Sequence, residues 1–110
     1  MEKVTLFYEE RPDLKISMEI YFKENGELFF DGYDIGKFVE EACGDSDYEY
    51  TYTIEPDHVE KLYKVFLIKD GDKWGLLKEI KKRFSVNEAY SLFGKFLAEH
   101  DIKYKGFTWS

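Results

Sequence analysis

The segment from Leu14 to Phe22 alternates between apolar side chains at even positions and mostly polar side chains at odd positions. A period of two is the spacing at which a β-strand presents side chains to one face. The segment therefore predicts a strand with one covered face and one face in water. Any fold of this chain must supply neighbouring strands and a cover for the apolar side.

Further strands are predicted on both sides of this one. Residues 4 to 8 form an earlier strand, and the polar residues 9 to 13 form a turn. Asn25 and Gly26 suit a type I′ hairpin turn, since both accept a positive φ. Two more strands are predicted over residues 27 to 33 and 47 to 54.

Helical spacing appears in four segments. A short helix is predicted over residues 35 to 43, with Asp34 as its cap. Pro56 begins a second helix that ends at residues 69 to 71, and a third covers residues 72 to 84. Ser85 and Glu88 match a capping box before a fourth helix over residues 86 to 100. The inward residues of this last helix are predicted to be Ala89, Leu92, Phe93, Phe96 and Leu97.

The tail from Ile102 to Trp109 is predicted to be a final strand or an extended clasp. The order of elements predicts the α+β class, with an antiparallel sheet of four to five strands and about four helices mostly packed on one face. A length of 110 residues fits one domain over residues 1 to 110.

Charge is distributed unevenly along the chain. The net charge is -7, which opposes binding to nucleic acid and to anionic membranes. Residues 1 to 60 hold 17 acids and 5 bases, a net of -12, and residues 61 to 110 hold 6 acids and 11 bases, a net of +5. Either the two halves attract each other modestly, or the acidic half steers a basic partner or a second copy.

The sequence contains no apolar run long enough to cross a membrane and no secretory signal pattern. A single cysteine, Cys43, excludes an internal disulfide and supplies too few ligands for a structural zinc site. We therefore expect a cytoplasmic protein without a cofactor.

Candidate catalytic groups are few. His58 and His100 lack a recognisable catalytic neighbour, and Cys43 falls at a predicted helix C-terminus, where the helix dipole disfavours a thiolate. Neither a nucleophile elbow nor a phosphate-binding loop is present. The sequence favours a protein that is not an enzyme and assigns no catalytic residue.

Clustered carboxylates leave one enzymatic alternative open. Four aspartates in neighbouring turns could share a divalent cation, in a small ligand-binding or metal-assisted hydrolytic enzyme: Asp31, Asp34, Asp45 and Asp47. The acids from residue 45 onward do not make an EF-hand, because Tyr50 and Pro56 stand where that loop needs Gly and Glu. Solvated loop acids are the simpler interpretation.

Several aromatic residues are candidates for protein contacts. Tyr48, Tyr50 and Tyr52 either pack in the core or form an amphipathic contact surface with Glu49 beside them. The interaction candidates are Tyr21, Glu49, Tyr50, Trp74 and Trp109. The basic cluster of Lys78, Lys81, Lys82 and Arg83 is interpreted as the solvated side of a helix.

Three motifs together carry a resemblance. They are Asp31-Gly32-Tyr33-Asp34-Ile35-Gly36, the strand segment Tyr48-Glu49-Tyr50, and the ending Phe107-Thr108-Trp109. The chain resembles a family of small uncharacterised bacterial proteins, which carries no assigned activity. The resemblance implies a bacterial, stand-alone domain.

These observations predict a small acidic protein that acts through protein-protein contacts. Its partner would be a second copy of the chain or a basic protein that it neutralises in the manner of toxin-immunity proteins. The acidic first half motivates this hypothesis, together with the lack of a catalytic motif.

Overall fold

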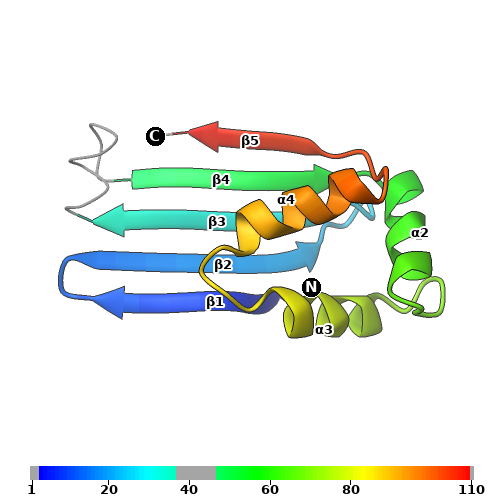
Figure 1. Ribbon diagram of the computed structural model, residues 1–110, viewed down its shortest axis with the longest axis horizontal. Helices are drawn as coiled ribbons and strands as arrows, with labels where there is room; N and C mark the ends of the chain where they lie inside the picture. Colours follow the sequence, from blue (N-terminus) through cyan, green and yellow to red (C-terminus); the bar gives the residue numbers. More distant parts are fainter. Residues whose placement is uncertain (1–2, 37–46, 110) are drawn as a thin grey trace.

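A computed structural model describes residues 3 to 36 and 47 to 109 of the chain. Five strands form one antiparallel sheet in the order of the sequence, so each strand pairs with the next one along the chain (Figure 1). The strands are β1 (Lys3–Arg11), β2 (Leu14–Phe22), β3 (Leu28–Gly36), β4 (Asp47–Ile54) and β5 (Lys105–Trp109). The predicted α+β class and antiparallel sheet are confirmed.

The burial of the β2 side chains confirms the alternation predicted for this strand. Its even-numbered residues from Ile16 to Phe22 are buried against the helices. In β1 a bulge lies between Thr5 and Phe7, and after it the side chains that face the helices fall at odd positions. The bulge allows Leu6 and Phe7 both to contact the core.

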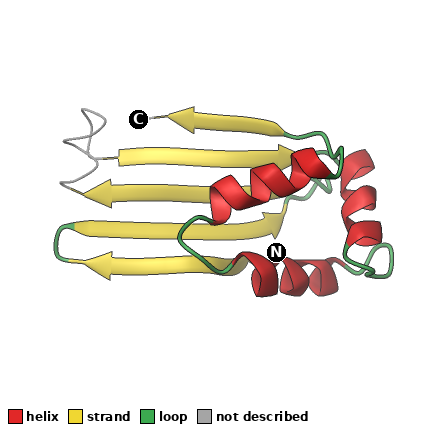
Figure 2. Cartoon of the chain, viewed as in Figure 1, coloured by secondary structure: helices red, strands yellow, loops and turns green. Residues whose placement is uncertain are grey.

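In the described part of the chain, three helices lie on one side of the sheet and at its end: α2 (Pro56–Val65), α3 (Lys73–Phe84) and α4 (Ala89–Glu99). Figure 2 shows α4 crossing the face of the sheet while α2 stands at the sheet's end. No helix in residues 3 to 36 and 47 to 109 is long and apolar enough to cross a membrane.

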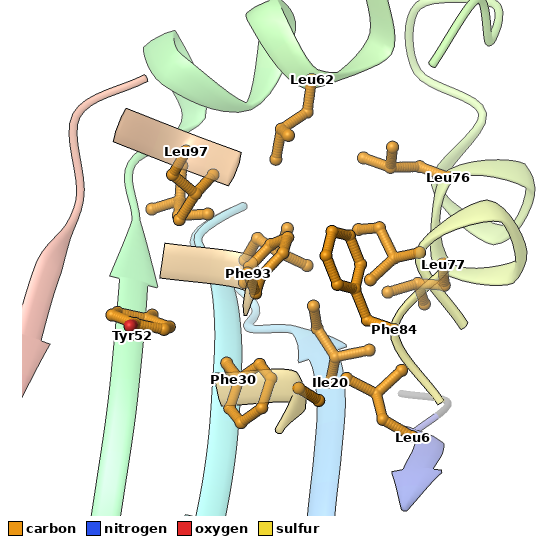
Figure 3. Packing of buried hydrophobic residues seen from close by; sticks show 14 of the residues in the cluster. Leu6, Ile20, Phe30, Tyr52, Leu62, Leu76, Leu77, Phe84, Phe93 and Leu97 are labelled. Atoms are coloured by element: carbon orange, nitrogen blue, oxygen red, sulfur yellow. The ribbon is translucent and has the colours of Figure 1, made fainter. Parts of the chain in front are cut away.

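The core lies between the sheet and these helices. Figure 3 shows Ile20 and Phe30 of the sheet meeting Phe84 of α3 and Phe93 of α4. Phe93 is fully buried and its ring stacks on Phe30, with the ring centroids 6.0 Å apart. Burial of these rings, together with the aliphatic side chains around them, stabilises the fold.

The predicted helix over residues 35 to 43 is wrong at its start. Ile35 and Gly36 belong to β3, where Ile35 pairs with Lys15 on one side and Asp47 on the other. Asp34 is likewise a strand residue and not a helix cap. Pairing with two neighbouring strands outweighs a helical pattern of this length. Residues 37 to 43 lie outside the described part of the chain, which holds three helices and not the expected four.

Two details of the later helices also differ from prediction. Ser85 ends α3, and its hydroxyl donates to the Lys81 carbonyl, whereas Glu88 precedes α4 without a side-chain cap. The Ser85 hydroxyl is therefore committed to the preceding helix, and no capping box forms. Leu92 is 44% exposed because it lies on the outer side of α4. The other four residues predicted to face inward are buried.

Other predictions about the connections and the tail have mixed outcomes. The tail does form a strand, β5, which pairs with β4. Gly26 takes a positive φ of 89°, but Asn25 does not, so the turn is not type I′. The five residues between β2 and β3 make a longer hairpin loop, in which the Lys23 amide donates to the Glu27 carbonyl.

Candidate functional site

The side of the sheet away from the helices is the candidate site, and we call it the open face. No described helix lies on it. Its residues come from all five strands: Lys3, Thr5, Tyr8, Glu10, Lys15, Ser17, Glu19, Tyr21, Phe29, Asp31, Tyr33, Ile35, Asp47, Glu49, Thr51, Thr53, Lys105, Phe107 and Trp109.

Strand register arranges these side chains in four rows that run across the strands. The first row is Lys3, Tyr21, Phe29, Thr53 and Lys105, and the second is Thr5, Glu19, Asp31, Thr51 and Phe107. The third row is Tyr8, Ser17, Tyr33, Glu49 and Trp109, and the fourth is Glu10, Lys15, Ile35 and Asp47. Charged and aromatic residues are therefore interspersed over this side of the sheet.

The open face exposes large apolar side chains at both edges. Phe107 and Trp109 are neighbours on β5, and each is 58% exposed. Tyr8, on the opposite edge strand β1, is 51% exposed. A group of exposed aromatic side chains on one face is typical of protein interaction surfaces.

Lysine side chains lie over several rings of this face. The Lys3 Nζ atom is 4.8 Å from the centroid of the Tyr21 ring, and Tyr21 packs edge-on against Phe29. The Lys15 Nζ atom is 6.0 Å from the rings of both Tyr8 and Tyr33. Interaction with Tyr33 and then Tyr8 raises the pKa of Lys15, so this lysine stays charged. These contacts place positive charges over rings that are half-buried or exposed.

The opposite side of the sheet holds a cluster of tyrosines under α4. The ring of Tyr52 stacks on Tyr90 at a centroid distance of 4.1 Å, and the Tyr52 hydroxyl donates to the Tyr90 carbonyl. The Tyr50 hydroxyl donates to Asp34 at 2.7 Å. Burial raises the pKa of both Tyr50 and Tyr52, so both hydroxyls remain protonated donors.

The structure divides the predicted interaction candidates between these two sides. Tyr21, Glu49 and Trp109 lie on the open face. Tyr50 is 4% exposed and packs beneath α4, so the solvent-facing alternative for the tyrosine row is wrong at this position. Trp74 lies on α3, 47% exposed and apart from the other candidates.

The aspartates considered for a metal site do not share a face. Asp31 lies on the open face, whereas Asp34 on the same strand faces the helix side and accepts from Tyr50. Asp47 is on the open face two rows from Asp31, and Asp45 lies outside the described residues. In residues 3 to 36 and 47 to 109, no three His, Cys, Asp or Glu side chains could hold a metal ion together.

Neither histidine lies on the open face, although His58 shares a cavity with Thr53 and Lys105 of that face. His100 follows the end of α4, where its ring packs on Phe96 at 4.5 Å between centroids. His58, in the first turn of α2, lines a shallow cavity of about 240 Å³ together with Lys103 and Tyr104. Its Nδ1 atom is buried without a hydrogen-bond partner among the described residues. Cys43 lies outside the described residues.

The basic cluster on α3 is a helix surface, as predicted. Lys78, Lys81, Lys82 and Arg83 are all exposed. Lys82 forms an ion pair at 3.4 Å with Glu79 of the same helix. The described residues contain one ion pair between the two halves of the chain, in which Lys105 lies 3.6 Å from Glu55.

Sequence reasoning missed Phe107, Tyr8 and Tyr33 as members of this surface. Phe107 alternates with Gly106 and Thr108 in the tail, and that alternation was the available signal. Tyr8 could not be assigned to a face, because the bulge at Thr5/Phe7 changes which side each later β1 residue occupies.

Comparison with protein-family models, with curated proteins and with solved structures gives no match to this chain. The function must therefore be argued from the geometry of the open face.

Proposed function

We propose that the protein acts by binding another protein molecule through the open face and catalyses no reaction of its own. The pair of Phe107 and Trp109 carries this proposal, because two large side chains that are each 58% exposed lie side by side on an uncovered sheet. Aromatic residues in such positions dominate the binding energy of protein interfaces. Binding would remove both rings from water.

The surrounding polar groups support the same function. Hydroxyl groups of Tyr8 and Tyr33, and carboxylates of Asp31 and Glu49, stand next to the aromatic rings. This mixture of aromatic and polar groups is typical of specific interfaces, in which an apolar centre is bordered by hydrogen-bonding groups. An uncovered sheet face suits contact with a second protein surface better than enclosure of a small molecule, because small-molecule sites are concave.

Affinity capture with matched variants tests the proposal. Phe107→Ser with Trp109→Ser removes the aromatic pair of the open face, and Leu92→Ser with Trp74→Ser removes a similar exposed pair from the helices. Each variant is used as bait in a lysate of the cells that carry the gene. The open-face variant should lose its bound proteins, copies of the chain included, and the helix variant should keep them. Equal retention by both variants would contradict the proposal.

A further inference from the structure

We propose that the open face binds the open face of a second copy, related by a two-fold axis that runs across the strands. Each strand then lies over the same strand of the second copy in the opposite direction. This inference rests on the proposed function and names its partner.

The axis passes between the second and third rows of the open face. It therefore places the first row of one copy over the fourth row of the other, and the second row over the third. On β1, Lys3 meets Glu10 of the second copy. On β2, Tyr21 meets Lys15, a pair that continues the lysine-over-ring contacts already present within one chain. Each contact occurs twice, because a two-fold interface is isologous.

The central rows also match in chemistry. Phe107 of β5 meets Trp109 of the second copy, which covers the most exposed rings of the face. On β3, Asp31 meets the ring and hydroxyl of Tyr33 in the second copy. In the outer rows of the same strand, Phe29 meets Ile35 of the second copy. The arrangement opposes no two like charges in any of its strand positions.

A two-fold axis along the strands gives the opposite result. It would place Lys3 over Lys105 of the second copy and Asp31 over its own counterpart. Like charges that meet across an interface are costly. The charges of the open face therefore discriminate between the two face-to-face arrangements.

The pattern of charges on the open face, and not their sum, favours a second copy over a strongly basic partner. The open face carries three lysines, Lys3, Lys15 and Lys105, against five carboxylates, Glu10, Glu19, Asp31, Asp47 and Glu49. The net charge of this face is therefore -2, from three positive and five negative groups. A uniformly basic surface would nevertheless oppose the three lysines, whereas in the dimer Lys3 meets Glu10 and the carboxylates of the two central rows meet uncharged residues.

The area of the face is compatible with a reversible dimer. Strand spacing and rise give a sheet face of about 600 Å² per copy. Standard specific interfaces bury about 800 Å² per partner, so the dimer falls near the lower end of that class. We expect a dissociation constant of about 1 to 100 µM, the range in which small interfaces operate.

Complementary charge variants test the pairing of Lys3 with Glu10. In Lys3→Glu or Glu10→Lys alone, like charges meet at two places, and dimerisation should weaken by about tenfold or more. When the two variants are mixed, both ion pairs form again between unlike chains, and dimers should return in sedimentation velocity. Within one chain these residues are seven positions apart on β1, about 20 Å or more, so they cannot pair internally.

The matched control mixes Lys3→Glu with Glu24→Lys. Glu24 is exposed in the loop after β2, away from the open face, and its substitution makes the same charge change. In this mixture the Glu24→Lys chains should dimerise with one another as wild type does, so dimer formation is followed through a fluorescent label on the Lys3→Glu chains. The labelled chains should join dimers less readily than with Glu10→Lys, because one of the two like-charge contacts remains. Rescue by Glu24→Lys as strong as rescue by Glu10→Lys would overturn the pairing, because net charge alone would then explain it.

Cross-linking tests the direction of the axis. Packed sheets lie about 10 Å apart, so a short bismaleimide reagent, and not a disulfide, is the suitable probe. In a Cys43→Ser background, a mixture of Asp31→Cys and Tyr33→Cys chains should couple to each other. Preferential coupling of Tyr33→Cys chains to themselves would overturn the arrangement.

The two proposals fail in different ways. If the wild-type chain is monomeric up to about 1 mM, about tenfold above the largest expected dissociation constant, the dimer is excluded. Loss of a different captured protein by Phe107→Ser with Trp109→Ser would then leave the proposed function standing. If the open-face variant keeps every captured protein, the proposed function itself fails.

Discussion

The Tyr50 hydroxyl donates a 2.7 Å hydrogen bond to the Asp34 carboxyl group across β3 and β4. Burial raises the pKa of Asp34, and the bond from Tyr50 opposes that rise. The carboxyl group is partly buried beside a ring that helps to form the core. The stability of the fold should therefore depend on pH through the titration of Asp34.

Asp34→Asn should stabilise the fold at pH 7. Folding raises the pKa of this carboxyl group, so its protonated form stabilises the folded state at a pH below the unfolded pKa. This stabilisation is lost as the pH rises through the folded pKa, where the partly buried group becomes charged. The Asn side chain carries no charge and keeps an oxygen for Tyr50. Because the group is only partly buried, we expect a gain below about 1 kcal/mol. Urea unfolding should show this gain at pH 7 and its disappearance near pH 3, and a variant less stable than wild type at pH 7 would contradict the account.

Tyr50→Phe should raise the pKa of Asp34 further. The substitution removes the donor that favours the charged form and leaves the burial of the site unchanged. The lost hydrogen bond should cost about 1 kcal/mol of stability at pH 7. Carbon-detected NMR titration of the Asp34 carboxyl group measures the shift directly. A lower or unchanged pKa would show that the bond does not act as described.

Gly32→Ala should destabilise the sheet strongly. Gly32 lies directly under the Tyr50 ring, and a Cβ atom there would overlap that ring. The ring is buried and cannot move without disturbing Tyr90 and Asp34, so we expect a loss of about 2 kcal/mol or more. Gly106→Ala is the control, because its Cβ would make ordinary contacts with the Tyr52 ring at 3.4 Å and the Tyr90 hydroxyl at 3.7 Å. Similar thermal unfolding of the two variants would argue against this packing.

Asp72→Ala should weaken the start of α3. The Gly75 amide donates to the Asp72 side chain at 3.0 Å, which is the bond of an N-cap. Its loss should cost about 1 kcal/mol in urea unfolding. Glu88 occupies the corresponding position before α4 without such a bond, so Glu88→Ala should change stability by less than about 0.5 kcal/mol. Equal losses in the two variants would contradict the assignment of the cap.

The sequence predicted those elements whose side chains alternate on a single pattern. β2 and β4 were predicted with their observed bounds, because one face of each is buried continuously. The residues Asp34, Ile35 and Gly36 fit both the start of a capped helix and a strand. Pairing with β2 and β4 decides between them, and that pairing is not a local property.

The candidate site was predictable only in part for a similar reason. Tyr21, Glu49 and Trp109 were named from sequence, but their assembly on one surface depends on the register of five strands. The sequence left open whether Tyr50 packs in the core or faces solvent. The position of α4, whose Tyr90 ring contacts Tyr50, shows that Tyr50 is covered. The two faces of the sheet differ in burial only because the helices cover one of them, and the strand pattern does not say which one that is.

Hydroxyl-radical oxidation of the two tryptophans tests the central claim about the open face most directly. Trp109 on the open face and Trp74 on α3 are 58% and 47% exposed, so each chain contains its own control. On raising the protein concentration from about 1 µM to 1 mM, which extends about tenfold above the largest expected dissociation constant, oxidation of Trp109 should slow several-fold while that of Trp74 stays constant. Unchanged oxidation of Trp109, or equal protection of both residues, would contradict binding of a second copy through the open face.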